Sequence, residues 1–335
     1  MKLATLRQDI PAGLVVFLVA LPLCLGIAQA SGLPPFVGLL TGVIGGLLVT
    51  ALSPSRFAVS GPAAGLVTIV VASVESLGSF SAFLLALALA GCLQIVLGMV
   101  RAGRFISLVP GSVIKGMLAA IGILLIMQQL PVALGAAESS SLRELFSGQT
   151  PLALPAMLVA GGGLIILWLW TTPALKRIKA LNWIPGPLIA VAAGGAMTLL
   201  IPHVQPQWAT QLPRITLPEF GSLRELVAGL DRPDWQAWQN PAVYTVAITL
   251  ALVASLETLL SQEALKKLRP QHPAPSPNKE MVAQGIGNLT AGLVGAMPIT
   301  AVIVRSSVNV SVGAQTRLSI VIHGALLLVC GLWFS

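Results

Sequence analysis

The chain has 335 residues, of which 56% are hydrophobic and only 9% are charged, and its mean hydropathy is +0.90. Soluble domains carry about 25% charged residues, so this composition indicates a membrane protein with several spanning segments. The apolar runs are of helix length and do not alternate with period two, which excludes a transmembrane β-barrel. The formal net charge of +8 does not indicate a nucleic-acid partner, because the basic residues are distributed among short loops between the apolar runs.

The apolar runs predict an all-α polytopic membrane protein with about eleven segments. These cover residues 11–30, 34–53, 60–74, 78–100, 106–134, 151–172, 183–201, 241–262, 278–295, 299–311 and 316–335. Two of them, 60–74 and 299–311, are too short for the roughly 20 residues that a spanning helix needs. We interpret these two as half-helices that begin within the membrane.

Small residues in the apolar runs are predicted to serve packing. Gly42, Gly45 and Gly46 in the second run favour a close approach of helices. The cysteines have neither disulfide nor zinc-site spacing, and we interpret them as small core residues; they are Cys24, Cys92 and Cys330.

The distribution of basic residues predicts a cytoplasmic N-terminus. If both short segments count as crossings, most Lys and Arg residues of the loops fall on the cytoplasmic side. That side then carries Lys2, Arg7, Arg56, Arg101, Arg104, Lys176, Arg177, Lys179, Lys266, Lys267, Arg269 and Lys279. The opposite side carries Arg143, Arg214, Arg224 and Arg232. The connections 135–150 and 202–240 are therefore predicted to be extracytoplasmic.

The second short segment contains a charged residue, Arg305, and a charge within an apolar run requires a physical explanation. An arginine near the bilayer centre costs about 3 kcal/mol or more, so it normally faces a cavity or a partner. Pro298 favours an extended lead-in, and a helix that begins after it would leave free backbone N–H groups and a positive dipole end beside Arg305. This arrangement predicts an anion site. The alternative is that Arg305 snorkels to the nearer interface or pairs with a carboxylate.

The two short segments resemble each other in design. Ser60-Gly61-Pro62 precedes the first and Met297-Pro298 precedes the second, at a separation similar to that between Pro11 and Pro241, which each open a long helix. A duplication of seven segments would place the copies in opposite orientations, and paired interrupted helices in inverted repeats indicate a transporter site near the membrane midplane. The alternative is that both prolines form ordinary helix kinks.

A second charge at membrane depth, Glu257, lies one helical turn from Ser261. A carboxylate and a hydroxyl on one helix face can bind Na⁺ through oxygen ligands, and a buried carboxylate can exchange a proton. Either property would make this pair a coupling site. The alternative is a Glu257–Arg305 ion pair that holds two helices together. His323, in the last segment, is interpreted as a packing residue, and no enzyme motif accompanies it.

Several stretches of the sequence carry a family resemblance. DIPAGLVVFLVALPLCLGIA, VSGPAAG, VPGSVIKGM, VASLETLLS and KEMVAQGIGNLTAGLVGAMPITAVIVRSSVNVSVGAQTRLS resemble the SulP family of inorganic anion transporters, along essentially the whole chain. The first and fourth stretches are most similar to a bacterial subgroup often associated with carbonic anhydrase. This similarity favours bicarbonate over sulfate as the substrate.

The resemblance implies fourteen segments in two inverted repeats of seven, shared with uracil-type permeases. A core domain would comprise residues 1–104 and 241–335, a gate domain would begin with 105–204, and residues 205–240 would form an extracytoplasmic loop. The chain ends at Ser335 without segments 12 to 14 or the STAS domain of many members, so it is expected to be a fragment with half of its gate domain.

The resemblance also implies an activity and a setting. We expect a secondary active transporter in the bacterial inner membrane that forms a homodimer, in which the core domain moves against the gate in an elevator-type motion. The substrate would be a small inorganic anion, coupled to Na⁺ or H⁺, with no cofactor beyond a possible Na⁺. An uncoupled anion channel and a nucleobase-type permease of the same fold are the alternatives.

The site residues follow from the same resemblance. The anion would lie between the starts of the two half-helices, at Ser60, Gly61, Pro62 and Ala63 and at Val304, Arg305 and Ser306. Glu257 and Ser261 correspond to the sodium ligands of sodium-coupled bicarbonate members, together with backbone carbonyls near Ala301, Val302 and Ile303. Glu257 replaces a shorter Asp of those members, which leaves Na⁺ and H⁺ coupling both open.

Overall fold

The computed structural model describes residues 3–104, 111–136, 147, 152–176, 186–211 and 229–333. The chain divides into two compact units, one made of Met1–Leu118 with Thr216–Ser335 and the other of Ala119–Ile215. The predicted core and gate boundaries remain predictions, and much of the predicted extracytoplasmic connections lies outside the described residues.

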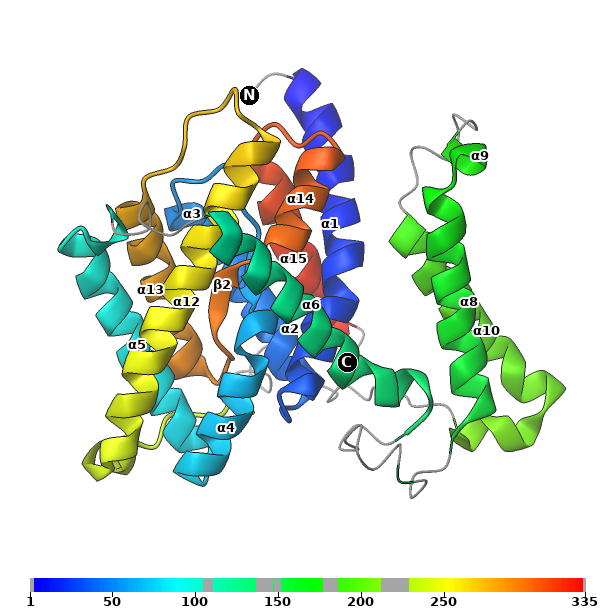
Figure 1. Ribbon diagram of the computed structural model, residues 1–335, viewed down its shortest axis with the longest axis horizontal. Helices are drawn as coiled ribbons and strands as arrows, with labels where there is room; N and C mark the ends of the chain where they lie inside the picture. The colour runs from blue at the N-terminus through cyan, green and yellow to red at the C-terminus, as the bar shows by residue number, and fades with distance from the viewer. Residues whose placement is uncertain are drawn as a thin grey trace. The chain divides into compact units, whose positions relative to one another are not determined.

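The first unit contains two sets of elements that follow the same order along the chain (Figure 1). Each set has a long helix, a second helix, a short strand that leads into a short helix, and a further helix. The first set is α1 (Leu3–Ala30), α2 (Pro35–Ile44) with the π-helical turn η1 (Gly45–Val49) and α3 (Thr50–Leu52), β1 (Ser60–Pro62), the 3₁₀ turn η2 (Ala64–Leu66), α4 (Val67–Leu77) and α5 (Phe80–Met99). The second is α12 (Pro241–Leu268), α13 (Pro277–Val294), β2 (Ile299–Ala301), α14 (Ile303–Ser311) and α15 (Leu318–Trp333), preceded by the 3₁₀ turn η6 (Trp235–Gln239).

Both short segments have the predicted construction, because an extended strand precedes each short helix. β1 and β2 pair in antiparallel register, with Ser60 opposite Ala301, Gly61 opposite Thr300 and Pro62 opposite Ile299. Pro62 lacks a backbone N–H, but a strand pair with no further neighbour tolerates proline at its end. α4 and α14 leave this pair in opposite directions, which Figure 1 shows as α14 above and α4 below the level of β2.

Glycines allow the helices of this unit to approach closely, as the sequence predicted for the second run. A Cβ on Gly46 of α2–η1 would lie 2.6 Å from the Cα of Gly324 on α15, and a Cβ on Gly45 would lie 2.3 Å from the Ser60 carbonyl oxygen. Between α5 and α13, a Cβ on Gly91 would lie 2.3 Å from the Leu289 backbone nitrogen. Backbone-to-backbone packing of this kind is typical of membrane helices.

The second unit contains most of α6 (Gly111–Ala133) together with α8 (Leu154–Thr171), α9 (Pro173–Lys176), α10 (Gly186–Val204) and the 3₁₀ turn η5 (Pro206–Gln211). α8 packs against α10. Large apolar side chains on these helices, such as Leu164, Trp168 and Leu199, are exposed, as expected for surfaces that face lipid or other protein.

Among the described residues, five helices are long and apolar enough to cross a membrane. They cover Thr5–Ala30, Pro35–Leu52, Phe80–Met99, Leu154–Thr171 and Pro241–Leu268. Shorter apolar helices cover Ala64–Leu77, Ile189–Ile201 and Leu318–Leu332. The all-α polytopic fold predicted from the sequence is confirmed.

Candidate functional site

The starts of two half-helices meet at the β1–β2 pair in the first unit. η2 and α4 begin directly after β1, and α14 begins directly after β2. In α14 the Ser306 backbone N–H bonds to the Val302 carbonyl, so the N–H groups of the three residues before Ser306 have no acceptor within the helix. Both positive helix ends are therefore directed at the strand pair, where they favour a negative charge.

Arg305 lies on the first turn of α14 and is fully buried. Its Nη1 donates a hydrogen bond to the Cys24 sulfur of α1 at 3.3 Å, and Nη1 also lies against Gly61 of β1. Its Nε and Nη2 have no hydrogen-bond partner among the described residues. A buried guanidinium with unused donors is costly, and an anion in reach of it would offset that cost.

The hydroxyls predicted for the anion site hold the strand pair together. The Ser60 Oγ accepts a hydrogen bond from Gln284 Nε2 at 2.8 Å. The Ser306 Oγ accepts from the Val59 N–H at 3.0 Å and donates to the Val302 carbonyl at 2.7 Å. These contacts leave backbone N–H groups and the Arg305 side chain as the groups with spare capacity for an anion.

The apolar members of the predicted anion site differ in exposure. Gly61, Pro62 and Ala63 are buried, whereas the Val304 side chain is 54% exposed on α14. The missing Cβ of Gly61 makes room for the Arg305 guanidinium, whose Nη1 would lie 2.4 Å from a Cβ at this position. The structure thus brings Gly61 and Arg305 into contact, although they are far apart in sequence.

Glu257 and Ser261 lie on one buried face of α12, as their spacing predicted. Glu257 is 7% exposed and Ser261 is 5% exposed. The Gly65 backbone in η2 lies close to the Glu257 carboxylate, whose Oε2 has no hydrogen-bond partner among the described residues. The alternative of a Glu257–Arg305 ion pair is not realised in the structure, where neither charged group contacts the other.

The backbone near Ala301 is also in contact with α12. The Ala301 N–H donates to the Thr258 Oγ at 3.2 Å, so consecutive residues of α12 touch the starts of both half-helices. The Val302 carbonyl already accepts two hydrogen bonds from Ser306. Ile303 begins α14 and is half-buried. A cation near Glu257 would therefore rely on the carboxylate, the Ser261 hydroxyl and carbonyl oxygens other than that of Val302.

Na⁺ prefers such oxygen ligands, whereas transition metals favour clusters of His, Cys and carboxylate groups. No cluster of three or more His, Cys, Asp or Glu side chains suitable for a metal ion occurs within the described part of the chain. The residues around Glu257 consequently fit a weakly held hard cation better than a structural transition metal.

Sequence reasoning missed a line of polar residues on α13. Asn288 Oδ1 accepts from the Ile299 N–H at 2.7 Å, and its Nδ2 donates to the Ile299 carbonyl at 3.0 Å and to Gln94 Oε1 at 2.7 Å. Gln284 Nε2 donates to both Ser60 Oγ and Glu280 Oε1. The three α13 residues are spaced four apart and share one helix face. This spacing was the signal that could have identified them.

Two further buried residues stand near Arg305. Cys24, predicted to be a small core residue, is its sulfur acceptor. His323 of α15 is fully buried, and neither ring nitrogen has a hydrogen-bond partner in the described part of the chain. The prediction that His323 is a packing residue thus leaves two polar atoms unexplained. Its Cδ2 lies 3.5 Å from the position of a Cβ on Gly46.

The sequence matches the sulfate permease family over residues 6–335. It is 29% identical over 348 residues to the putative sulfate transporter YvdB of Bacillus subtilis, and 28% identical over 345 residues to the bicarbonate transporter BicA of Picosynechococcus sp.. These alignments cover 100% and 97% of this chain but 61% and 57% of the relatives, so the chain spans about six-tenths of their length. The matched family and these relatives are transporters rather than enzymes.

Solved structures share the fold. The transmembrane domain of a cyanobacterial bicarbonate transporter BicA superposes with a TM-score of 0.77 at 24% identity, covering 100% of this chain and 84% of that domain. SLC26A9 superposes with a TM-score of 0.75 at 14% identity, covering 100% of this chain and 55% of that protein. These similarities confirm the predicted inverted-repeat fold with two half-helices.

Proposed function

Since this chain belongs to the sulfate permease family, we propose that it forms membrane segments of a secondary active transporter for a small inorganic anion. Bicarbonate is the favoured substrate and sulfate is the next. The named relatives include transporters of both anions, which supports this pair of candidates.

The observation that carries the proposal is the meeting of two positive helix ends beside a buried arginine. The first turns of η2–α4 and α14 present backbone N–H groups at the β1–β2 pair, and Arg305 keeps two nitrogens without partners. A compact anion can accept several such donors at once, because it has no apolar part to accommodate. A nucleobase would need polar side chains for its edges, and the predicted substrate residues here are mostly small and apolar.

Glu257 is the proposed coupling residue, with Ser261 as a second oxygen ligand. The Glu257 carboxylate lies close to the Gly65 backbone, at the start of the first half-helix. A cation bound to this carboxylate would therefore lie close to the anion. Binding the two ions together reduces the charge that must be buried, which favours their joint movement. The cation is Na⁺ or H⁺ in this proposal.

We further propose that the transporter lies in a bacterial inner membrane with its N-terminus in the cytoplasm, and that it works as a homodimer. The asymmetric distribution of Lys and Arg supports this orientation. The proposed movement is of elevator type, in which the unit that carries the strand pair shifts relative to a gate domain.

The decisive experiment is uptake of labelled bicarbonate and labelled sulfate by proteoliposomes that contain the full-length protein, at fixed pH with and without a Na⁺ gradient. Sodium-stimulated bicarbonate uptake supports the proposal with Na⁺ as the coupling ion. Sulfate uptake driven by a proton gradient supports it with H⁺. Uptake that follows the anion gradient alone would indicate a channel instead, and uptake of neither anion would refute the substrate class.

A further inference from the structure

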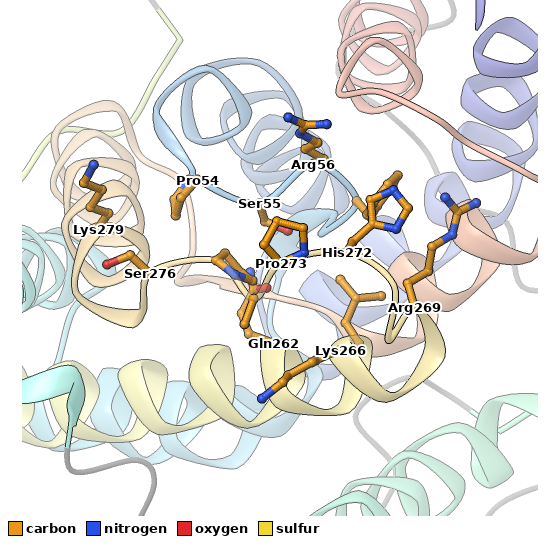
Figure 2. A pocket seen from close by; sticks show the side chains of 14 residues that line it. Pro54, Ser55, Arg56, Gln262, Lys266, Arg269, His272, Pro273, Ser276 and Lys279 are labelled. Carbon is orange, nitrogen blue, oxygen red and sulfur yellow. The ribbon is translucent and has the colours of Figure 1, made fainter.

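A basic cavity lies in the first unit, and none of its lining residues belongs to the candidate anion site. It has a volume of about 330 Å³ and lies among the chain before β1, the last turns of α12, and the connection from α12 to α13 (Figure 2). All of its lining residues are within the described part of the chain. The cavity belongs to one unit only.

Positive charge dominates the lining. Four cationic side chains surround the cavity from three different segments: Arg56, Lys266, Arg269 and Lys279 (Figure 2). Among the lining residues, all of them described, there is no Asp or Glu. Lys266 has a carboxylate 3.7 Å away, that of Glu263, in a half-exposed pair that is worth little in water. The other three cations form no ion pair with a described carboxylate.

The cavity is partly preorganised by an aromatic residue. The Arg269 guanidinium carbon lies 4.6 Å from the centre of the Phe57 ring, and the His272 ring meets Phe57 edge-on at 5.0 Å. Cation–π contact limits the freedom of an arginine side chain while leaving its N–H donors free. The charge on Arg269 is thus held at the cavity wall before any ligand arrives.

Two buried polar groups at the cavity lack partners. Gln262 is 8% exposed, and neither its Oε1 nor its Nε2 has a hydrogen-bond partner among the residues that the structure describes. It approaches the Glu280 carboxylate without forming a hydrogen bond of good geometry. Glu280 itself does not line the cavity, and its oxygens accept hydrogen bonds from Ser53 and Gln284. His272 Nδ1 is likewise buried and unpartnered. Such groups point to a ligand that supplies hydrogen-bond partners.

We propose that this cavity binds the phosphate group of an organic phosphate, either a soluble molecule or the headgroup of an anionic phospholipid. A lining with four cationic side chains and no carboxylate favours a ligand with the negative charge and the acceptor oxygens of a phosphate. Ligand pockets usually have volumes of about 300–1,000 Å³, so the cavity has room for more than a single inorganic ion. Leu265 and several prolines in the lining provide apolar surface for the organic part.

The position of the cavity gives such binding a structural consequence. Arg56 precedes β1 by only a few residues, whereas Arg269 follows the end of α12 and Lys279 lies in the first turn of α13. A ligand that spans the cavity between these side chains would fasten the segment that enters β1 to the two helices that carry Glu257 and Gln284. The cavity site does not depend on the proposed transport activity.

The soluble arm of the test measures binding of inorganic pyrophosphate to the purified full-length protein by titration calorimetry. We expect the double substitution Arg269→Gln with Lys279→Gln to weaken binding by about tenfold or more, because two charge-assisted contacts are lost. Arg56→Gln, on another segment, should weaken binding by a smaller factor. Lys267→Gln is the matched control, since Lys267 is exposed beside Lys266 but does not line the cavity.

The lipid arm measures retention of phosphatidylglycerol, against phosphatidylcholine, by native mass spectrometry of the same variants from mixed nanodiscs. Selective retention of phosphatidylglycerol that is lost in the double variant, with no pyrophosphate binding, assigns the site to a lipid headgroup. Pyrophosphate binding that is lost in the double variant assigns it to a soluble phosphate. If neither ligand binds the wild-type protein, or if the control loses as much as the double variant, the proposed site is refuted.

Discussion

The Arg305 guanidinium lies directly against Gly61, where an added Cβ would stand only 2.4 Å from Nη1. Gly61→Ala is therefore expected to displace the guanidinium, which is fully buried. Overpacking of this kind costs about 1–3 kcal/mol, so anion affinity should fall by roughly tenfold or more. Concentration-dependent uptake in proteoliposomes, with monodispersity checked in detergent, provides the measurement.

Gly26→Ala is the matched control for that substitution. Gly26 lies on α1, and an added Cβ there would meet no atom within 4 Å. Alanine is the better helix former by about 0.5–1 kcal/mol, so this variant should be at least as stable as the wild type and should transport normally. Equal losses in both glycine variants would contradict the proposed role of Gly61.

Replacement of Arg305 itself should remove the anion site. Arg305→Ala eliminates the buried positive charge and two unpartnered nitrogens, and hydrogen bonds to charged groups contribute about 1.5–3 kcal/mol each. We expect bicarbonate and sulfate binding to become undetectable by calorimetry while the protein stays monodisperse. Cys24→Ala removes only the sulfur acceptor of Nη1, so it should reduce affinity much less. Unchanged affinity in a well-folded Arg305→Ala variant would mean that the anion binds elsewhere.

The positions of the segments could be predicted from the sequence because they depend on local composition. A spanning helix needs a long apolar run, and a run that is too short behind a proline predicts a half-helix. Arg305 was identified for the same reason, since a charge in an apolar run is visible without knowledge of its neighbours. The predicted strand-like lead-in before Arg305 is now seen as β2.

The partners of these residues could not be predicted, because they lie far away along the chain. Cys24 and Arg305 are separated by 281 positions, and Ser60 and Gln284 by 224. The spacing of Glu280, Gln284 and Asn288 marks one face of a helix but does not say what faces it. The π-helical turn at Gly45–Val49 was also missed, since an apolar run of helix length does not distinguish a π-helical turn from an α-helix.

The proposed coupling residue can be tested by an isosteric substitution. Glu257→Gln keeps the shape of the side chain and its contact with the Gly65 backbone but removes the negative charge. Uptake should then lose its dependence on Na⁺ and on a proton gradient, because no charged ligand for the cation remains. The measurement is uptake with and without each gradient.

Glu263→Gln serves as the control for the same change of charge on the same helix. Glu263 is half-exposed and pairs with Lys266, a contact worth about 0–1 kcal/mol. This variant should keep the full cation dependence of the wild type. If Glu257→Gln also keeps it, the coupling site lies elsewhere in the protein.

Asn288 is expected to be required for stability of the strand pair rather than for contact with the anion. Asn288→Ala would remove the hydrogen bonds that Asn288 makes to the Ile299 N–H, the Ile299 carbonyl and Gln94 Oε1, in a buried region. Each such group costs about 1–3 kcal/mol, so the melting temperature in detergent should fall by several degrees or more. Thr290→Ala, two residues further along α13, removes only a hydrogen bond to the Ile286 carbonyl within the helix and should change stability little. The measurement is thermal unfolding of the Asn288→Ala and Thr290→Ala variants in detergent. Equal melting temperatures of these two variants would show that Asn288 does not hold β2 in place.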